Sequence, residues 1–391
     1  MIPVIRPWLG PEEAEAAAAV VASGWVAQGP RVAEFEARFA AATNARYAVA
    51  VSSCTAALHL ALVVAGVGPD DEVIVPSLSF IATTNAARYV GATPVFADVD
   101  PMTQNLTPKS VEPHLTEHTR AVILVDQAGT PADLDGMRSL CDARSITVIE
   151  DAACAAGSTY RSRPAGAGAE LAAFSFHPRK LVTTGEGGMI TTSDEHVAAR
   201  LRRLREHGMD VSAAERHQSR QPIIERYVEV GYNYRMTDVQ AAIGLVQLGR
   251  LGQMVSRRRE LAERYQRLLA GIPGLQTAAD PDYGTTNYQS FWIALPVDFP
   301  VSRDALLTSL AAAGVSARRG IMAAHIEPAY AAHPHAELPV TERLTASSIV
   351  LPLFHEMTKF EQDVVVSAIY AAAGIASPQP GGVPRLSSQT V

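Results

Sequence analysis

Short apolar segments alternate with longer alanine-rich segments over the first half of the chain, from about residue 12 to about residue 195. The segment Val148-Ile149-Glu150-Asp151, for example, has the apolar start of a buried strand and ends in acidic residues. Strands that alternate with helices favour a mostly parallel sheet that is covered on both faces. The pattern therefore predicts an α/β fold for this part of the chain.

The second half begins with a long stretch of helical spacing at residues 238–269, enough to run from a large domain into a smaller one. Beyond it we expect an α+β region with these strands and helices: strands near 290–295 and 315–318, helices near 303–313 and 359–373.

The chain is accordingly predicted to have two domains and a tail. The large domain is expected at residues 1–250 and the small C-terminal domain at residues 251–375. Residues 376–391 are rich in turn formers and poor in core residues, so we expect a disordered tail. The polar segment 211–229 is expected to form a flexible loop near the mouth of an active site.

One lysine lies between an apolar strand and a glycine-rich turn. Residues 173–188 read Ala-Phe-Ser-Phe-His-Pro-Arg-Lys-Leu-Val-Thr-Thr-Gly-Glu-Gly-Gly, and the lysine is Lys180. A lysine that attacks an aldehyde must be neutral, desolvated and fixed in place, and the glycines leave room for a flat ring. Lys180 is therefore a candidate attachment point for pyridoxal phosphate, although the pattern alone also fits an exposed lysine in a hairpin.

Two further segments have features that this cofactor needs. Asp151 ends a strand 29 residues before Lys180, and a carboxylate there would keep a pyridine nitrogen protonated. In residues 49–62, Ser53 and Thr55 stand at the start of an alanine- and leucine-rich helix, whose free N–H groups form an anion site. Ser175 adds another hydroxyl near Lys180. Taken singly, the aspartate also fits a turn or cap, and the hydroxyls fit an N-cap without a ligand.

Composition restricts the partners. The formal net charge of −7, without a dense Lys/Arg run, argues against nucleic acid. No apolar run approaches the ~20 residues of a membrane span, and the first residues lack a signal-peptide pattern, so we expect a cytoplasmic protein without a membrane partner. Four arginines fit either a solvated helix face or a guide for an anionic substrate: Arg200, Arg202, Arg203 and Arg205.

The cysteines give no sign of a metal site or of structural disulfides. Cys54, Cys141 and Cys154 stand in apolar or small-residue contexts without a CxxC spacing. An odd number of cysteines without such a framework fits reduced thiols, so no metal is predicted.

Together these ordered motifs resemble the DegT-type sugar aminotransferases, within the fold type I pyridoxal-phosphate enzymes. The resemblance runs from about Ile2 to about Ala372, nearly the whole chain. It also includes residues 23–30, 75–80, 91–100 and 231–238. The resemblance implies a fold type I large domain with a mostly parallel sheet and a smaller C-terminal α+β domain.

The resemblance also implies an activity. An amino group would move from an amino acid, glutamate or glutamine, to the keto group of a sugar, a nucleotide-linked sugar or a cyclitol. Lys180 would be the Schiff-base lysine and proton shuttle, and Asp151 the partner of the pyridine nitrogen of pyridoxal 5'-phosphate. Phe80 would stack on the cofactor ring.

Other residues receive roles from the resemblance. The phosphate would be held by Ser53, Cys54, Thr55 and Ser175. Asn233 would reach the phosphate from the neighbouring subunit, which implies a homodimer with shared active sites. Trp25 and His325 fall in segments that line the substrate opening in relatives.

The chain departs from the family pattern at three places. Cys154 stands where the family usually has Gln or His, three residues beyond the aspartate, and is expected to contact the cofactor. Residues 126–129 read Asp-Gln-Ala-Gly where a His followed by apolar or aromatic residues is frequent, and Cys54 replaces the glycine of the usual phosphate turn. The lysine and the aspartate are retained, so the departures concern the substrate more than the cofactor.

Two alternatives share the scaffold. Some relatives catalyse dehydration or aromatisation, but the dehydratases replace the lysine with histidine, whereas this chain has Lys180. The other alternative is a regulatory or sensor protein that binds pyridoxal phosphate without turnover.

Overall fold

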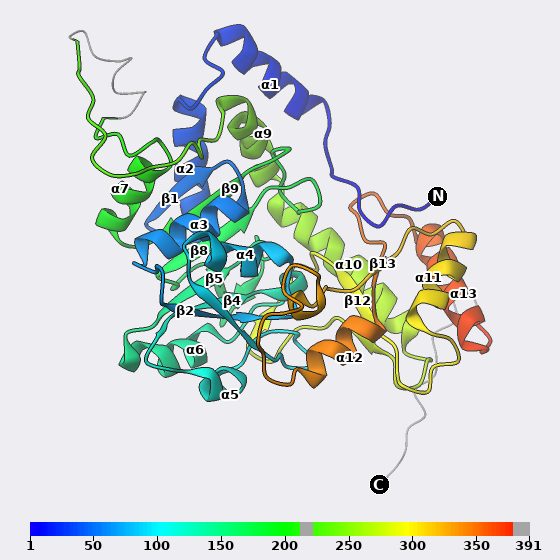
Figure 1. Ribbon diagram of the computed structural model, residues 1–391. Coiled ribbons are helices and arrows are strands. Elements are labelled where there is room, and N and C mark those ends of the chain that lie inside the picture. The colour runs from blue at the N-terminus through cyan, green and yellow to red at the C-terminus, as the bar shows by residue number, and fades with distance from the viewer. Residues whose placement is uncertain (212–221, 378–391) are drawn as a thin grey trace.

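A seven-stranded sheet forms the centre of the larger part of the computed structural model, which describes residues 1–211 and 222–377 (Figure 1). The strands lie in the order β1-β9-β8-β5-β4-β2-β3. Their bounds are β1 Tyr47–Val51, β2 Glu72–Pro76, β3 Thr93–Ala97, β4 Thr119–Val125, β5 Thr147–Asp151, β8 Leu171–Ser175 and β9 Gly188–Thr192. Neighbouring strands from β8 to β3 pair in parallel, and β9 runs antiparallel to β8 and β1. The predicted α/β fold with a mostly parallel sheet is confirmed.

Helices cover both faces of this sheet. One face packs against α3 (Cys54–Val64), α4 (Ile81–Tyr89) and α7 (Glu195–Leu204), and the other against α2 (Pro30–Ala42), α6 (Leu134–Cys141) and α9 (Asp238–Gly249). Successive residues of β2 alternate, with Val73 and Val75 on the α3 side and Ile74 on the α2 side, and all three are fully buried. Each such side chain contributes about 1.5–3 kcal/mol, so both helical layers are held to the sheet by apolar packing.

The C-terminal part contains a second, four-stranded sheet in the order β10-β12-β14-β13. Its strands are β10 Gln276–Thr277, β12 Phe291–Ala294, β13 Arg318–Arg319 and β14 Ser348–Leu351. The accompanying helices are α10 Leu251–Leu269, α11 Arg303–Ala312, α12 Pro339–Ser347 and α13 Lys359–Ala373. The strand expected at residues 315–318 is shorter and lies slightly later, because Val315 itself pairs with Ile2 in an isolated bridge.

The remaining elements are short, apart from α1 (Pro11–Ser23). They are the helices α5 Pro108–Val111, η1 Glu112–His114, η2 Gln127–Gly129, η3 Asp142–Arg144 and η4 Ala324–Ile326. A three-stranded sheet in the order β11-β6-β7 joins Gly284–Thr285, Thr159–Tyr160 and Arg163–Pro164.

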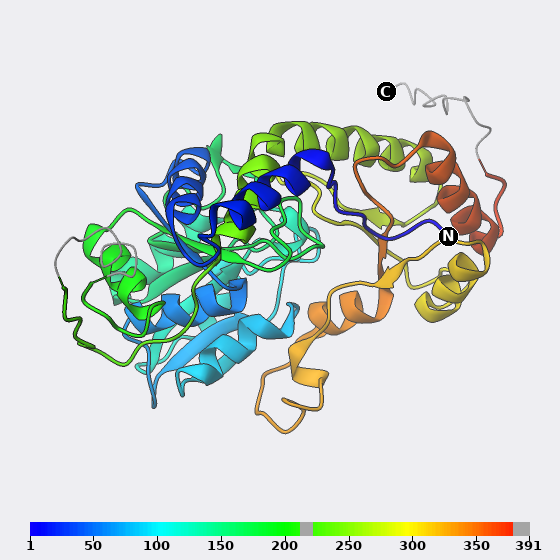
Figure 2. The ribbon, with the colours of Figure 1, turned by 90° about the horizontal axis from the view of Figure 1, so that it is seen from above.

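The N-terminal segment lies beside the C-terminal elements, as Figure 2 shows for the blue end of the chain. The backbone N–H of Ile2 donates to the carbonyl of Gly314 (2.7 Å), and that of Leu353 donates to the carbonyl of Val4 (3.1 Å). The first residues therefore pack with the second sheet, although the sequence pattern grouped them with the large domain.

The long helix expected at residues 238–269 consists of two helices, α9 and α10, that meet at Arg250. Arg250 ends α9 and begins α10, with backbone angles of φ −100° and ψ −2° that differ from those of a regular helix. Its guanidinium forms ion pairs with Glu13 (2.9 Å) and Glu12 (2.7 Å) of α1 and lies 4.9 Å from the centre of the Trp8 ring. These contacts with distant residues fix Arg250 at the junction of the two helices. The helical spacing of the sequence does not reveal them.

The arginine cluster of α7 is engaged in ion pairs. Arg200 and Arg203 contact Glu229 at 3.0 and 3.2 Å, and the buried Arg205 contacts the buried Glu36. These contacts give the cluster a structural role. The loop predicted at residues 211–229 lies partly outside the described residues, which omit 212–221, and the predicted tail lies outside them from residue 378.

Candidate active site

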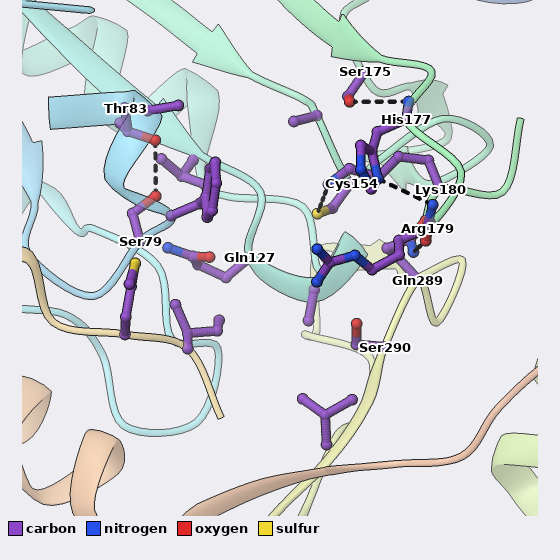
Figure 3. A pocket seen from close by; sticks show the side chains of 18 of the residues that line it. Ser79, Thr83, Gln127, Cys154, Ser175, His177, Arg179, Lys180, Gln289 and Ser290 are labelled. Atoms are coloured by element: carbon purple, nitrogen blue, oxygen red, sulfur yellow. Dashed lines mark hydrogen bonds between the residues drawn. The ribbon is translucent and has the colours of Figure 1, made fainter. Parts of the chain in front are cut away.

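A cavity of about 510 Å³ opens where the carboxyl ends of the large sheet face the four-stranded sheet. One wall comes from the ends of β4, β5 and β8 and from the first turns of α3 and α4, and the other from β12, β13 and β14. Open α/β sheets place their ligands at the carboxyl ends of strands. Figure 3 shows part of this cavity with its polar side chains.

Lys180 lies in the turn between β8 and β9, with its side chain in the cavity wall. Its Nζ donates a hydrogen bond to Sγ of Cys154 at 3.0 Å (Figure 3). Burial by itself lowers the pKa of the Lys180 amine, but the neighbouring Cys154 and Asp151 outweigh it and raise the pKa above its ordinary value. The free amine therefore carries a proton at neutral pH and must lose it before it attacks an aldehyde.

Asp151 ends β5 and is 4% exposed. Its Oδ2 accepts a hydrogen bond from Oγ1 of Thr83 (2.9 Å), which in turn contacts Oγ of Ser79 (2.8 Å). Its Oδ1 accepts from the backbone N–H of Ala153 at 3.2 Å. Burial raises the pKa of Asp151, whereas the hydrogen bonds from Thr83 and Ala153 oppose that shift. The carboxylate is thus fixed in position at the cavity, where a cationic partner would stabilise its charge.

The first turn of α3 supplies backbone N–H groups to the same cavity. Ser53 is the N-cap, and its Oγ accepts from the backbone N–H of Ala56 at 3.1 Å. Cys54 and Thr55 follow as first-turn residues, whose N–H groups have no acceptor within the helix. With the positive end of the helix dipole, this turn forms an anion site.

Gly188 allows this turn to lie against β9. A Cβ at this position would stand 2.5 Å from the carbonyl carbon and oxygen of Ser53 and 2.6 Å from the nitrogen of Cys54. Only a residue without a side chain fits such a separation between two backbones. The glycine-rich end of the lysine segment is therefore explained by close packing as well as by room for a ligand.

Eight of the predicted site residues line the cavity together: Ser53, Cys54, Thr55, Phe80, Asp151, Cys154, Ser175 and Lys180. Phe80 is 68% exposed, so its ring is a free apolar surface at the mouth. Ser175 Oγ accepts from the backbone N–H of His177 at 3.4 Å (Figure 3).

Three predicted residues lie outside this lining. Asn233 is exposed beside α7, where it pairs with Glu206. Trp25 is partly buried, and its indole N–H donates to the carbonyl of Gln28 at 3.1 Å. His325 is 3% exposed, and its Nδ1 lies 2.6 Å from Oγ of Ser77.

Sequence reasoning missed residues that hold the lysine turn and the floor of the cavity. Gln289 accepts a hydrogen bond from the backbone N–H of Leu181 (3.0 Å) and donates to the carbonyl of Arg179, so it fixes both sides of Lys180. Gln127 lines the cavity and donates to the carbonyl of Leu78. The contact of Gln289 spans more than one hundred residues of chain, which is why no local pattern revealed it.

The departure at residues 126–129 places the carboxyl of Asp126 near that of Glu150, next to the cavity. Oδ1 of Asp126 accepts from the backbone N–H of Ala132 (2.8 Å), and Oε1 of Glu150 accepts from that of Gly166 (3.0 Å). Both residues are buried, and their remaining oxygens have no other partner among the described residues. Burial and the proximity of Glu150 raise the pKa of Asp126, and burial raises that of Glu150. The buried surroundings therefore favour the protonated form of each carboxyl more than water does.

The described residues contain no cluster of three or more His, Cys, Asp or Glu side chains that would hold a metal ion. Within the same part of the chain, no helix has the length and apolar character needed to cross a membrane. The three cysteines are free thiols.

Comparison with known proteins gives the same assignment along almost the whole chain. Residues 7–370 match the model of the DegT/DnrJ/EryC1/StrS aminotransferase family. The aminotransferase TlmJ from Streptoalloteichus hindustanus is 36% identical with a TM-score of 0.88, and the match covers 96% of this chain and 99% of that one. DesV from S. venezuelae, solved in complex with a ketimine intermediate, is 34% identical with a TM-score of 0.87 and the same coverage.

A third structure extends this likeness to more distant sequences. The putative sugar aminotransferase Spr1654 from Streptococcus pneumoniae, in its PMP form, is 28% identical with a TM-score of 0.90, and the match covers 96% of this chain and 99% of that one. The predicted enzyme class, a pyridoxal-phosphate-dependent aminotransferase of fold type I, is confirmed at the level of the family. The chain belongs to the DegT/DnrJ/EryC1/StrS aminotransferase family.

Proposed function

We propose that this enzyme transfers an amino group from an amino acid, glutamate or glutamine, to the keto group of a sugar, a nucleotide-linked sugar or a cyclitol. The observation that carries the proposal is the arrangement of three groups in one cavity: the Lys180 amine, the Asp151 carboxylate and the first turn of α3. The likeness to solved structures of a putative sugar aminotransferase and of the sugar aminotransferase CalS13 supports the sugar acceptor.

The residues present fit pyridoxal phosphate. The first turn of α3 offers N–H groups and a positive dipole for the phosphate, and the close approach of Gly188 fixes that turn. Asp151 would face the pyridine nitrogen, and Phe80 offers an exposed apolar ring for stacking. When bound, the cofactor supplies an aldehyde carbon and a ring that withdraws electrons from the substrate carbon.

The residues of this chain then have separate tasks. The Lys180 amine would hold the cofactor at its aldehyde carbon, and the same amine would carry the proton to and from the substrate carbon. Gln289 holds the lysine turn by hydrogen bonds on both sides of Lys180. The hydrogen bonds from Ser79 through Thr83 to Asp151 keep the Asp151 carboxylate oriented. The sulfur of Cys154 accepts a hydrogen bond from Lys180.

A homodimer with shared active sites is part of the proposal. Asn233 lies outside the cavity of its own chain, as expected if it serves the partner's phosphate site. The nearby segment exposes large apolar side chains, with Ile224 at 88%, Tyr227 at 63% and Val230 at 85% exposure. A second copy of the chain would bury these side chains. We also propose that Trp25 and His325 contact the substrate. The enzyme is proposed to act in the cytoplasm.

The proposal is tested by a half-reaction with glutamate. The purified protein, loaded with pyridoxal phosphate, should convert glutamate to its keto acid and pyridoxal phosphate to pyridoxamine phosphate. Asp151→Asn should lower this rate by orders of magnitude, because the carboxylate charge is lost while the shape is kept. Absence of the half-reaction with every amino acid would favour a sensor without turnover.

The position of the cofactor is tested separately by chemical labelling. The chain has only three lysines, Lys109, Lys180 and Lys359. Borohydride reduction of the loaded protein followed by peptide mapping should place the label on Lys180. Lys109→Ala serves as the control and should keep the label, whereas Lys180→Ala should lose it. A label on Lys109 or Lys359 would contradict the assignment.

A further inference from the structure

Two hydrogen-bond donors in the cavity wall are buried without a partner among the described residues. They are the indole Nε1 of Trp292 and the amide Nε2 of Gln104. Each side chain belongs to a residue that is 2% exposed. A buried donor without a hydrogen bond costs about 1–3 kcal/mol, so two such groups in one cavity call for an explanation.

Trp292 belongs to the sheet that forms the C-terminal wall. It pairs with Val350 of β14, which in turn pairs with Arg318 of β13. Residues in register across strands present their side chains on one face, and all three line the cavity. Trp292 also follows Gln289 by three residues, and Gln289 holds the lysine turn. The indole therefore lies close along the chain to the residues that position the reacting group.

Gln104 is held in the cavity wall by a tight loop after β3. Its backbone is in the left-handed region at φ 64°, which is unfavourable for a residue with a side chain. The carboxylate of Asp100 accepts hydrogen bonds from the N–H groups of Met102 (2.9 Å) and Thr103 (2.8 Å), and Asn105 is fixed by the carbonyl of Thr130 (2.9 Å). The loop is thus rigid on both sides of a strained residue, a feature that accompanies binding sites.

The loop and the sheet also contact each other outside the cavity lining. The amide nitrogen of Gln276, in β10 next to β12, lies 3.7 Å from the sulfur of Met102. Gln276 pairs with Ala294, two residues from Trp292 on the same face of the sheet. The two unpaired donors therefore belong to neighbouring surfaces of one cavity.

We propose that Gln104 and Trp292 form a subsite that binds the hydroxyl-bearing ring of the keto acceptor. The indole N–H is only a donor, so its partner must offer an acceptor oxygen. The amide of Gln104 donates to a second oxygen. A sugar or cyclitol ring supplies both oxygens. This inference rests on the proposed function and names the residues that select the acceptor.

The test measures binding of non-reactive rings to the loaded enzyme by calorimetry. The probes are myo-inositol, D-glucose and UDP-glucose, which carry hydroxyls but no keto group. We expect at least one probe to bind at millimolar concentration, and Trp292→Phe and Gln104→Met each to weaken that binding about tenfold, equivalent to about 1.4 kcal/mol. The preferred probe shows whether the ring is free or nucleotide-linked.

Two controls separate recognition from loss of structure. Trp8→Phe removes an indole N–H outside this cavity and should leave probe binding unchanged. The melting temperature of unliganded Gln104→Met should not fall below that of the wild type, because a buried unpaired donor is removed at nearly constant side-chain volume. A purely structural role for the Gln104 amide would lower it.

Three results would overturn the subsite. They are binding of no probe by the wild type, equal binding by wild type and both variants, or an equally large loss in the glutamate half-reaction, which would assign the pair to the amino donor. Failure of the proposed function gives a different result, because the wild type would then lack the glutamate half-reaction whatever the probes do.

Discussion

Substitution of Gly188 by alanine should disturb both stability and cofactor binding. The new Cβ would stand 2.5 Å from the Ser53 carbonyl group and 2.6 Å from the Cys54 nitrogen, and all three are backbone atoms. Ordinary contact would require β9 and α3 to separate by roughly 1 Å. Gly188 is paired with both Val51 of β1 and Ser175 of β8, so that movement would strain two strand pairings.

The expected cost is about 1–3 kcal/mol of unfolding free energy, the usual range for overpacking. The same movement displaces the first turn of α3, and a hydrogen bond from it to a charged phosphate contributes about 1.5–3 kcal/mol. Loss of one such bond would weaken binding of pyridoxal phosphate by at least about tenfold. Urea unfolding of the cofactor-free protein and absorbance titration with pyridoxal phosphate measure the two effects separately.

The control is Gly252→Ala in α10, where the structure places no atom within 4 Å of the new Cβ. That change should stabilise the protein by about 0.5–1 kcal/mol, because glycine is unfavourable inside a helix. Wild-type stability together with wild-type cofactor affinity in Gly188→Ala would show that the contact between β9 and α3 is not tight, and the reasoning would fail.

Three further predictions concern single side chains. Asp238 accepts hydrogen bonds from three backbone N–H groups at the start of α2. Asp238→Ala should therefore lower the urea midpoint by the equivalent of at least about 2 kcal/mol, and Asp238→Asn should lower it by less. An unchanged midpoint in Asp238→Ala would contradict this expectation. Asp126 and Glu150 have raised pKa values because both carboxyls are buried, so folding binds protons and stability should fall as the pH rises above about 4. Asp126→Asn should flatten that slope in urea midpoints measured across pH, and an unaltered slope would contradict the raised pKa of Asp126. Cys154→His should keep the rate of the glutamate half-reaction within about tenfold of the wild-type rate, which is roughly 1.4 kcal/mol of barrier, and should change the choice of acceptor more strongly. A half-reaction found only in the variant would show that Cys154 disables the natural protein.

The sequence by itself determined the parts of the site that depend on local order. An apolar strand that ends in Asp151, a hydroxyl cluster before an alanine-rich helix and Lys180 before a glycine-rich turn are each readable within a few residues. Strands that alternate with helices place their carboxyl ends at one edge of the sheet, so these segments had to come together. This is why the α/β fold and five residues of the cavity wall were predictable from local order: Ser53, Thr55, Asp151, Ser175 and Lys180. The resemblance to the family added the other three, Cys54, Phe80 and Cys154.

Only the tertiary structure decided which distant side chains complete the site. Gln289 reaches the lysine turn from more than one hundred residues away, and Arg250 bends a helix through its contacts with α1. Gln104 and Trp292 have no local signal, because an unpaired buried donor becomes visible only when every neighbour is in place. Local spacing specifies which face of an element is buried, whereas the packing of elements against one another specifies what each buried polar group meets.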